Sequence, residues 1–295
     1  MGLLADLIPT NLAAEKVKFL AAQGKYDPQF TYNQDFSYQT LTKYGLPQEN
    51  YYQKAQNYLQ NIPQDKKVTK KLMTEEEVTF EITSLCDKLQ IQSPTIIFRH
   101  DQNGNFMLGN DSLKIRLPIS FDKTSFLLSL NHEIQTHYLR RLNNKLQPWA
   151  KEKRPKENWI RTEEGLATYN GHRQSDSRNL GRLTFLYCLV DLAQKSSFQK
   201  CYQQALEFFQ NQELAFTYTT RVKRGLTDTS QPGGFTKDIV YWEGYHEIKD
   251  WLSDPRHDLH DLYWGRISWR EVEELRPRAI TEGLIYPTFI NDRIE

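Results

Sequence analysis

Residues 130–137 read Leu-Asn-His-Glu-Ile-Gln-Thr-His, and the rest of the chain is best interpreted outward from this octapeptide. Its two histidines, His132 and His137, are five positions apart, whereas the common metal-binding motif HExxH sets them four apart. Because an α-helix turns by about 100° per residue, five steps leave two side chains about 140° out of line. A π-helical turn, with i→i+5 hydrogen bonds, removes that offset, and such turns favour functional sites. If both histidines bind one ion, the spacing therefore predicts a locally widened helix.

The periodicity around the octapeptide predicts one long helix over residues 125–143. Two short strands precede it, at residues 94–98 and 114–117, and Asn103-Gly104 between them is a turn signal. We therefore expect a small antiparallel sheet beside the helix.

A second segment, Thr162-Glu-Glu-Gly-Leu-Ala-Thr168, lies on a following helix predicted at residues 162–173. Many zinc peptidases take a third ligand from a glutamate on such a helix, and two histidines with one glutamate leave one position of a catalytic zinc open. Small residues on the face of Glu164 allow a close approach to the first helix; they are Ala167, Thr168 and Gly171. Alone, the same pattern also fits an ordinary amphipathic helix with an exposed pair of glutamates.

The remaining chain is predicted to be mostly helical, which makes the fold class α+β. Further helices are expected at residues 11–22, 51–62, 74–89, 179–194, 198–210 and 237–252. Thr74 and Glu77 form a capping box at the start of the third of these. No linker separates two domains, so we expect residues 1–295 to form a single catalytic unit. Within it, roughly residues 1–90 make a helical N-terminal part and roughly residues 91–295 the core.

Composition excludes several classes of protein. With 38% hydrophobic and 25% charged residues the chain is globular, and a net charge of +1 gives no indication of nucleic-acid binding. Three widely spaced cysteines fit neither a disulfide framework nor a cysteine-based zinc site. The N-terminus lacks the pattern of a signal peptide, and no run approaches 18 apolar residues. We therefore expect a cytoplasmic protein that is not inserted in a membrane.

Three stretches together resemble a known family. HEIQTHYLR, TEEGLA and RVKRGLTDTSQPGGFTKDIVYWEG occur in this order and are similar to the microtubule-associated tyrosine carboxypeptidase family, zinc peptidases with an HExxxH helix. The resemblance implies a zincin-like fold in which His132, His137 and Glu164 bind zinc and Glu133 is the general base. Glu164 is favoured over Glu163 because bacterial relatives, named for a QEGLA motif, keep only the glutamate before glycine. The implied reaction removes a C-terminal residue, most simply tyrosine, from a protein such as α-tubulin.

The resemblance also directs attention to groups that would hold the substrate. A carboxypeptidase must bind a terminal carboxylate, for which arginine is suited by its paired N–H donors. The candidates for substrate binding are Arg221, Arg224 and Lys237, with Tyr241 as an oxyanion donor. The strand at residues 114–117 is the expected edge for pairing with the substrate backbone.

One position departs from the family pattern. The family usually has glycine where this chain has Gln135, and glycine would ease a widened turn. We expect the glutamine side chain to narrow or alter the cleft.

Alternative interpretations stay open at this point. One is a peptidase of the same family with a different peptide substrate, and another is a folded binding module that keeps the motif without turnover. His257 and His260, flanked by two aspartates, are a rival metal pair. The nearby Pro255 and charged neighbours favour a solvated turn there instead.

Overall fold

The computed structural model describes residues 3–61, 71–100, 104–152, 156–172 and 178–291. The chain divides into two compact units. Unit 1 comprises Met1–Ile62 and Leu180–Trp242, and unit 2 comprises Pro63–Asn179 and Glu243–Glu295. This division differs from the expected boundary near residue 90, because the predicted helix after Thr74 belongs to unit 2.

The fold is mostly helical with one small sheet, which confirms the α+β class. No helix among the described residues has both the length and the apolar character that a membrane span requires.

Among the described residues of unit 1, the regular elements are all helices. Its elements are α1 (Leu3–Asp6), α2 (Leu12–Ala21), α3 (Tyr38–Leu41), α4 (Glu49–Gln60), α9 (Arg178–Ala193), α10 (Phe198–Phe209), α11 (Gln212–Lys223) and the first residues of α12 (Ile239–Leu252). Aromatic rings hold α2, α10 and α11 together, because Phe19 lies edge-on to Phe198 and Tyr202 and also contacts Phe216. Helix α11 was not expected from the sequence.

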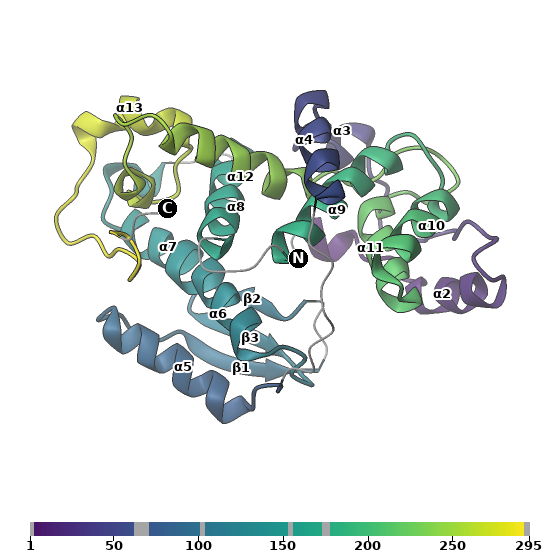
Figure 1. The fold of residues 1–295 in the computed structure, drawn as a ribbon, viewed down its shortest axis with the longest axis horizontal. Coiled ribbons are helices and arrows are strands. Elements are labelled where there is room, and N and C mark those ends of the chain that lie inside the picture. The colour runs from purple at the N-terminus through teal and green to yellow at the C-terminus, as the bar shows by residue number, and fades with distance from the viewer. Residues whose placement is uncertain (1–2, 62–70, 101–103, 153–155, 173–177, 292–295) are drawn as a thin grey trace. The chain divides into compact units, whose positions relative to one another are not determined.

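Unit 2 contains the three-stranded sheet (Figure 1) and also the metal-binding candidates. Its elements are α5 (Glu75–Lys88), β1 (Thr95–Arg99), β2 (Phe106–Leu108), β3 (Ser112–Arg116), α6 (Lys123–His132), η1 (Glu133–Tyr138), α7 (Leu139–Asn144), η2 (Pro148–Lys151), α8 (Lys156–His172), the rest of α12, η3 (Leu259–Tyr263), η4 (Trp269–Glu271), α13 (Val272–Leu275) and η5 (Arg276–Arg278). The segment η1 is π-helical, whereas η2, η3, η4 and η5 are 3₁₀ turns.

The sheet is mixed, so the expectation of an antiparallel sheet was wrong. The strand order is β1-β3-β2, with β1 parallel to β3 and β2 antiparallel to it. The sequence pattern missed β2, which is only three residues long and makes the hairpin with β3. Because β2 pairs with one edge of β3, β1 pairs with the opposite edge and runs parallel to β3. The expected edge strand at residues 114–117 is also wrong, since β3 is paired on both sides.

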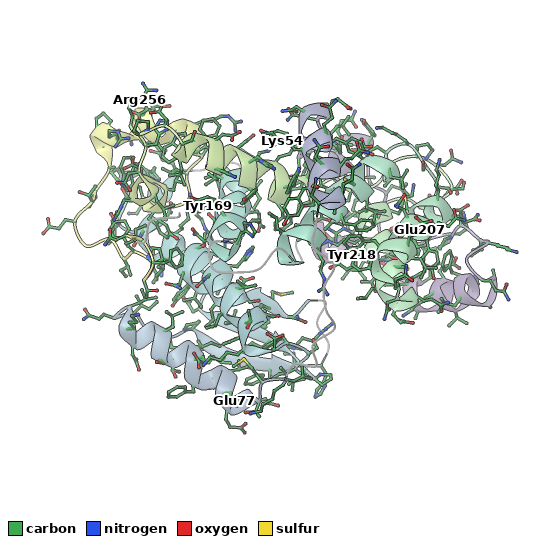
Figure 2. All side chains as sticks on the ribbon, viewed as in Figure 1. Lys54, Glu77, Tyr169, Glu207, Tyr218 and Arg256 are labelled. Atoms are coloured by element: carbon green, nitrogen blue, oxygen red, sulfur yellow. The ribbon has the colours of Figure 1, made fainter. Side chains whose placement is uncertain are left out.

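One hydrophobic core joins the sheet to the helix that carries the octapeptide. The predicted capping box is confirmed: Thr74 Oγ1 accepts from the Glu77 N–H, and Glu77 accepts from the Thr74 N–H (Figure 2 labels Glu77). The apolar face of α5 then packs with β3 and α6. The buried members of this core include Val78, Ile82, Cys86, Leu113, Ile115, Phe126, Leu130, Ile134 and Tyr138. The octapeptide is thereby anchored on its apolar side.

A second core of unit 2 lies around α7, α8, α12 and η3. Its buried members include Leu139, Trp149, Leu166, Ile248, Trp251, Leu262, Tyr263 and Ile267. The helix carrying the octapeptide contributes Leu139 to this core and Leu130 to the other. Because the helix formed by α6, η1 and α7 is buried in both cores, the position of its polar face, which carries the two histidines, is fixed.

Candidate active site

The octapeptide begins in α6 and continues into η1. Asp122 caps α6 by accepting a hydrogen bond from the Ser125 N–H at 2.9 Å. Residues Glu133–Tyr138 then form the π-helix that the histidine spacing predicted. The Leu139 N–H donates to the Ile134 carbonyl, five residues back.

Side chains support the widened turn. The Thr136 hydroxyl donates to the Asn131 carbonyl at 2.9 Å, and Tyr263 donates to the Gln135 carbonyl at 2.8 Å. Asn170 on α8 donates to both of these hydroxyl groups, at 2.8 Å and 3.0 Å. A π-turn leaves some backbone carbonyls without the N–H partner that an α-helix would provide. These side-chain bonds satisfy such carbonyls, which would otherwise be buried without a hydrogen bond at a cost in stability.

The widened turn brings the two histidines together. His132 Nε2 and His137 Nε2 are 3.1 Å apart. Glu164 Oε2, from α8, lies 3.6 Å from His132 Nε2 and 3.5 Å from His137 Nε2. Within the described ranges, these three residues are the one group of histidine, cysteine or acidic side chains placed to hold a metal ion.

Glu133, the expected general base, is half-buried at the start of the π-turn. Among the described residues, none forms a hydrogen bond or ion pair with its carboxylate. That carboxylate therefore stays available to accept a proton.

Glu163, which the sequence interpretation left without a role, contacts one of these histidines. His137 Nδ1 donates to Glu163 Oε1 at 2.9 Å. The other carboxylate oxygen pairs with the buried Arg140 guanidinium. The adjacent glutamates on α8 thus serve different nitrogens of the His137 ring. Sequence spacing did not show this, because Arg140 and Glu163 meet only through the packing of α7 on α8.

The electrostatics of this group follow from its burial. Burial raises the pKa of Glu163, but the charge of Arg140 and the bond from His137 outweigh that effect, so the pKa is lowered. Burial lowers the pKa of His137, yet Glu163 and Glu164 together raise that pKa to about 10. His137 thus lies between two carboxylates, whose negative charge favours a proton on its ring.

Two glycines determine how closely α8 approaches α12. A Cβ atom added to Gly165 would lie 2.3 Å from the Gly244 carbonyl carbon, and one added to Gly244 would lie 2.2 Å from the Arg161 carbonyl oxygen. Backbone thus meets backbone next to Glu164, and no side chain fits there. Gly171 faces Leu128 instead, with room for a methyl group, since its Cβ would lie 3.8 Å from that carbonyl oxygen.

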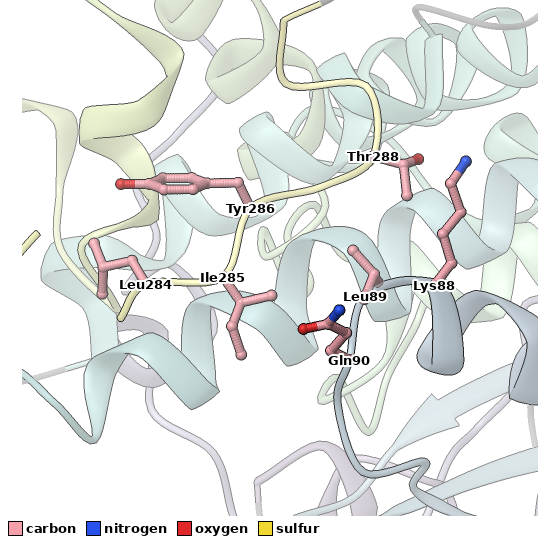
Figure 3. Close-up of a pocket in the computed structure, with 7 residues that line it drawn as sticks. All are labelled: Lys88, Leu89, Gln90, Leu284, Ile285, Tyr286 and Thr288. Carbon is pink, nitrogen blue, oxygen red and sulfur yellow. The ribbon is translucent and has the colours of Figure 1, made fainter. Parts of the chain in front are cut away.

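The Gln135 side chain binds a segment near the C-terminus. Its Oε1 accepts from the Thr288 N–H at 2.7 Å and from the Thr288 hydroxyl at 2.9 Å, while its Nε2 donates to Asn131 at 2.6 Å. Its polar atoms are therefore occupied within the protein rather than directed at a ligand. Residues 284–286 and 288 also border a pocket of about 450 Å³ with residues 88–90 (Figure 3).

Comparison with known proteins identifies the family. The profile of the family described as "Microtubule-associated tyrosine carboxypeptidase" matches residues 15–295. The chain belongs to this family. Three relatives are each named "Microtubule-associated tyrosine carboxypeptidase 1": that of Rattus norvegicus is 30% identical, and those of Mus musculus and Homo sapiens are each 27% identical. Each match covers 98% of this chain and 65% of the relative, so the chain spans about two thirds of these relatives' length.

The substrate-binding candidates of this tyrosine carboxypeptidase family member lie in unit 1, whereas the metal candidates lie in unit 2. Arg221 pairs bidentately with the buried Asp238, at 2.9 Å and 2.6 Å. Arg224 stacks on the Phe235 ring, 4.9 Å from its centroid. Lys237 Nζ donates to the Tyr241 hydroxyl at 3.2 Å.

The charges of Arg221, Arg224 and Lys237 all act on the buried Asp238. Burial raises the pKa of Asp238, but Arg221, Arg224 and Lys237 together outweigh that effect and lower it. Burial and repulsion from Arg221 lower the pKa of Arg224. Three cations thus surround one acid, although Arg221 is already committed to that acid. Their role in holding a substrate carboxylate stays a prediction.

The rival histidine pair is engaged in local contacts. His257 Nδ1 donates to the Trp251 carbonyl at 2.7 Å, and its ring stacks on that of Trp251. His260 Nδ1 pairs with Asp258 at 2.6 Å. His257 thus lies in the turn after α12 and His260 in η3, each engaged with a neighbouring residue.

Proposed function

We propose that this protein is a zinc metallocarboxypeptidase of the zincin-like type. The observation that carries the proposal is the convergence of His132, His137 and Glu164, with ligand atoms 3.1, 3.5 and 3.6 Å apart. Ligands about 2.1 Å from one tetrahedral zinc ion lie about 3.4 Å from each other. The three side chains therefore fit zinc with little rearrangement. Two histidines and one carboxylate also leave a fourth position for water or substrate.

The chemistry follows from the residues beside this group. Bound zinc would polarise the scissile carbonyl and lower the pKa of a bound water. Glu133, with no other partner among the described residues, takes the proton of the attacking water and passes it to the leaving amine. The carboxylate of Glu164 would hold the ion together with the two histidines and would balance part of its charge.

We further propose that the bond cleaved is the last peptide bond of a protein whose C-terminal residue is tyrosine, with α-tubulin or microtubules as the partner. The names of the relatives support this reading of the substrate. Within unit 1, Arg224 and Lys237 carry the kind of charge that binds a terminal carboxylate, and Tyr241 carries a hydroxyl donor. A cytoplasmic site of action follows from that choice of substrate.

Zinc content and turnover test the proposal together. Metal-replete wild-type protein should contain about one zinc per chain, and His137→Ala should lose it. Glu133→Gln should keep the zinc and the fold but lose hydrolysis by orders of magnitude, because the amide cannot take a proton. Undiminished zinc in His137→Ala would contradict the ligand assignment. Zinc binding without hydrolysis of any C-terminal peptide by the wild type would favour a silent binding module, and release of another residue would favour a different substrate.

A further inference from the structure

The His137 ring is held from both of its nitrogen atoms. Nε2 faces His132 and Glu164, while Nδ1 donates to Glu163 at 2.9 Å. A neutral imidazole that binds metal through one nitrogen carries its proton on the other. The bond to Glu163 therefore selects the tautomer in which Nε2 is the ligand atom.

Glu163 is itself held rigidly. Its second oxygen pairs with Arg140, which is 0% exposed. The other two nitrogen atoms of that guanidinium, Nε and Nη2, donate to the main-chain carbonyls of Leu262 and Ile267 at 2.8 Å each. A planar guanidinium with a bond from each of its three nitrogen atoms has little freedom to turn. The orientation of His137 is thus tied, through two side chains, to the backbone around η3.

We propose that Glu163 and Arg140 are positioning residues of the metal centre, which set the tautomer and ring orientation of His137 for binding zinc. The proposal rests on the zinc site proposed above and assigns the first glutamate of the EEG sequence a role distinct from the second. A carboxylate that accepts the free N–H of a ligating histidine also raises the basicity of that ligand. Losing such a partner typically weakens metal binding about 10- to 100-fold.

A matched control exists in the same unit. Glu247 on α12 is also a buried acid, 8% exposed, and pairs with Arg270 at 3.0 Å. It accepts further bonds from Trp269 Nε1 at 3.0 Å and from Arg161 Nη1, on α8, at 3.3 Å. None of these partners is a candidate ligand. Neutralising Glu247 therefore removes the charge of a buried acid whose partners do not include a candidate metal ligand.

Zinc affinity measured by chelator competition, alongside thermal unfolding, tests the positioning role. Glu163→Ala should bind zinc about 10- to 100-fold more weakly than wild type. Glu163→Gln should lose less, because its amide oxygen still accepts the Nδ1 proton, and Glu247→Gln should bind as wild type does. Wild-type affinity in a folded Glu163→Ala protein would overturn the proposal. Absence of zinc from the wild type would instead contradict the zinc site itself.

A second measurement needs no variant, since Glu163→Ala leaves a buried arginine without its counter-charge and risks unfolding. Proton–nitrogen NMR of histidine-labelled, zinc-loaded wild-type protein reports the tautomer of each ring. We expect the His137 signal to show a protonated Nδ1 and a metal-bound Nε2. Coordination through Nδ1 would overturn the proposal, because Glu163 then could not receive that proton.

Discussion

Replacing Gly165 by alanine probes the contact that sets the position of Glu164. The new Cβ would lie 2.3 Å from the Gly244 carbonyl carbon and 2.5 Å from its Cα. Carbon atoms in contact lie about 3.5–4.0 Å apart, so α8 and α12 must separate by about 1 Å. Overpacking costs about 1–3 kcal/mol, and a backbone obstacle favours the upper end. Alanine returns about 1 kcal/mol in helix propensity, which leaves a net loss of about 2 kcal/mol.

Differential scanning calorimetry measures this loss, with Gly171→Ala as the matched control on the same helix. Gly165→Ala should lower the unfolding temperature by roughly 4–8 °C and weaken zinc binding, because Glu164 moves with its neighbour. Gly171→Ala has room for its methyl group and should raise stability by about 0.5–1 kcal/mol. If both variants unfold at or above the wild-type temperature, the reasoning about the helix contact is refuted.

Two further predictions concern groups around the site and in unit 1. Gln135→Ala removes two acceptor contacts to Thr288 and should cost about 1–3 kcal/mol, with faster hydrogen exchange of the Thr288 amide; unchanged exchange would contradict the anchoring role. Burial lowers the pKa of Lys223 to about 8, although its ammonium group donates to the Ser196 and Gln231 carbonyls. Because the folded pKa lies below the unfolded value, the folded protein releases the proton first, and stability relative to Lys223→Met should rise by about 2 kcal/mol from pH 8 to pH 10. The free energy of unfolding of each protein is measured by urea titration at several pH values. If the two free energies change in parallel with pH, the pKa of Lys223 is not lowered in the folded protein.

The widened turn of the octapeptide was predictable from the sequence, because it follows from the spacing of the two histidines. Two histidines five residues apart can share an ion only on a widened turn, and the π-helix at Glu133–Tyr138 has that form. The capping box at Thr74 was equally local, since its two bonds span three residues.

Features that depend on distant partners were not predictable. Strand β2 has three residues, too few to show alternation, and without it the pairing of β1 with β3 was assigned the wrong direction. Glu163 forms an ion pair with Arg140, and Gly165 lies against the backbone of Gly244. Both contacts arise only when the helices pack, so neither could be predicted from local sequence. Gln135 was expected to alter the cleft, yet its amide binds a segment 153 residues further along the chain.

Peptide hydrolysis tests the central claim most directly. A peptide ending in free tyrosine and the same peptide with an amidated C-terminus are incubated with zinc-loaded wild type and with Glu133→Gln, and the products are weighed by mass spectrometry. The wild type should remove one tyrosine from the free acid and act far more slowly on the amide. The reason is that a hydrogen bond between a cation and a carboxylate is stronger than one to a neutral amide. Glu133→Gln should leave both peptides intact. Equal cleavage of acid and amide, or turnover by Glu133→Gln at the wild-type rate, would contradict the assignment as a metallocarboxypeptidase.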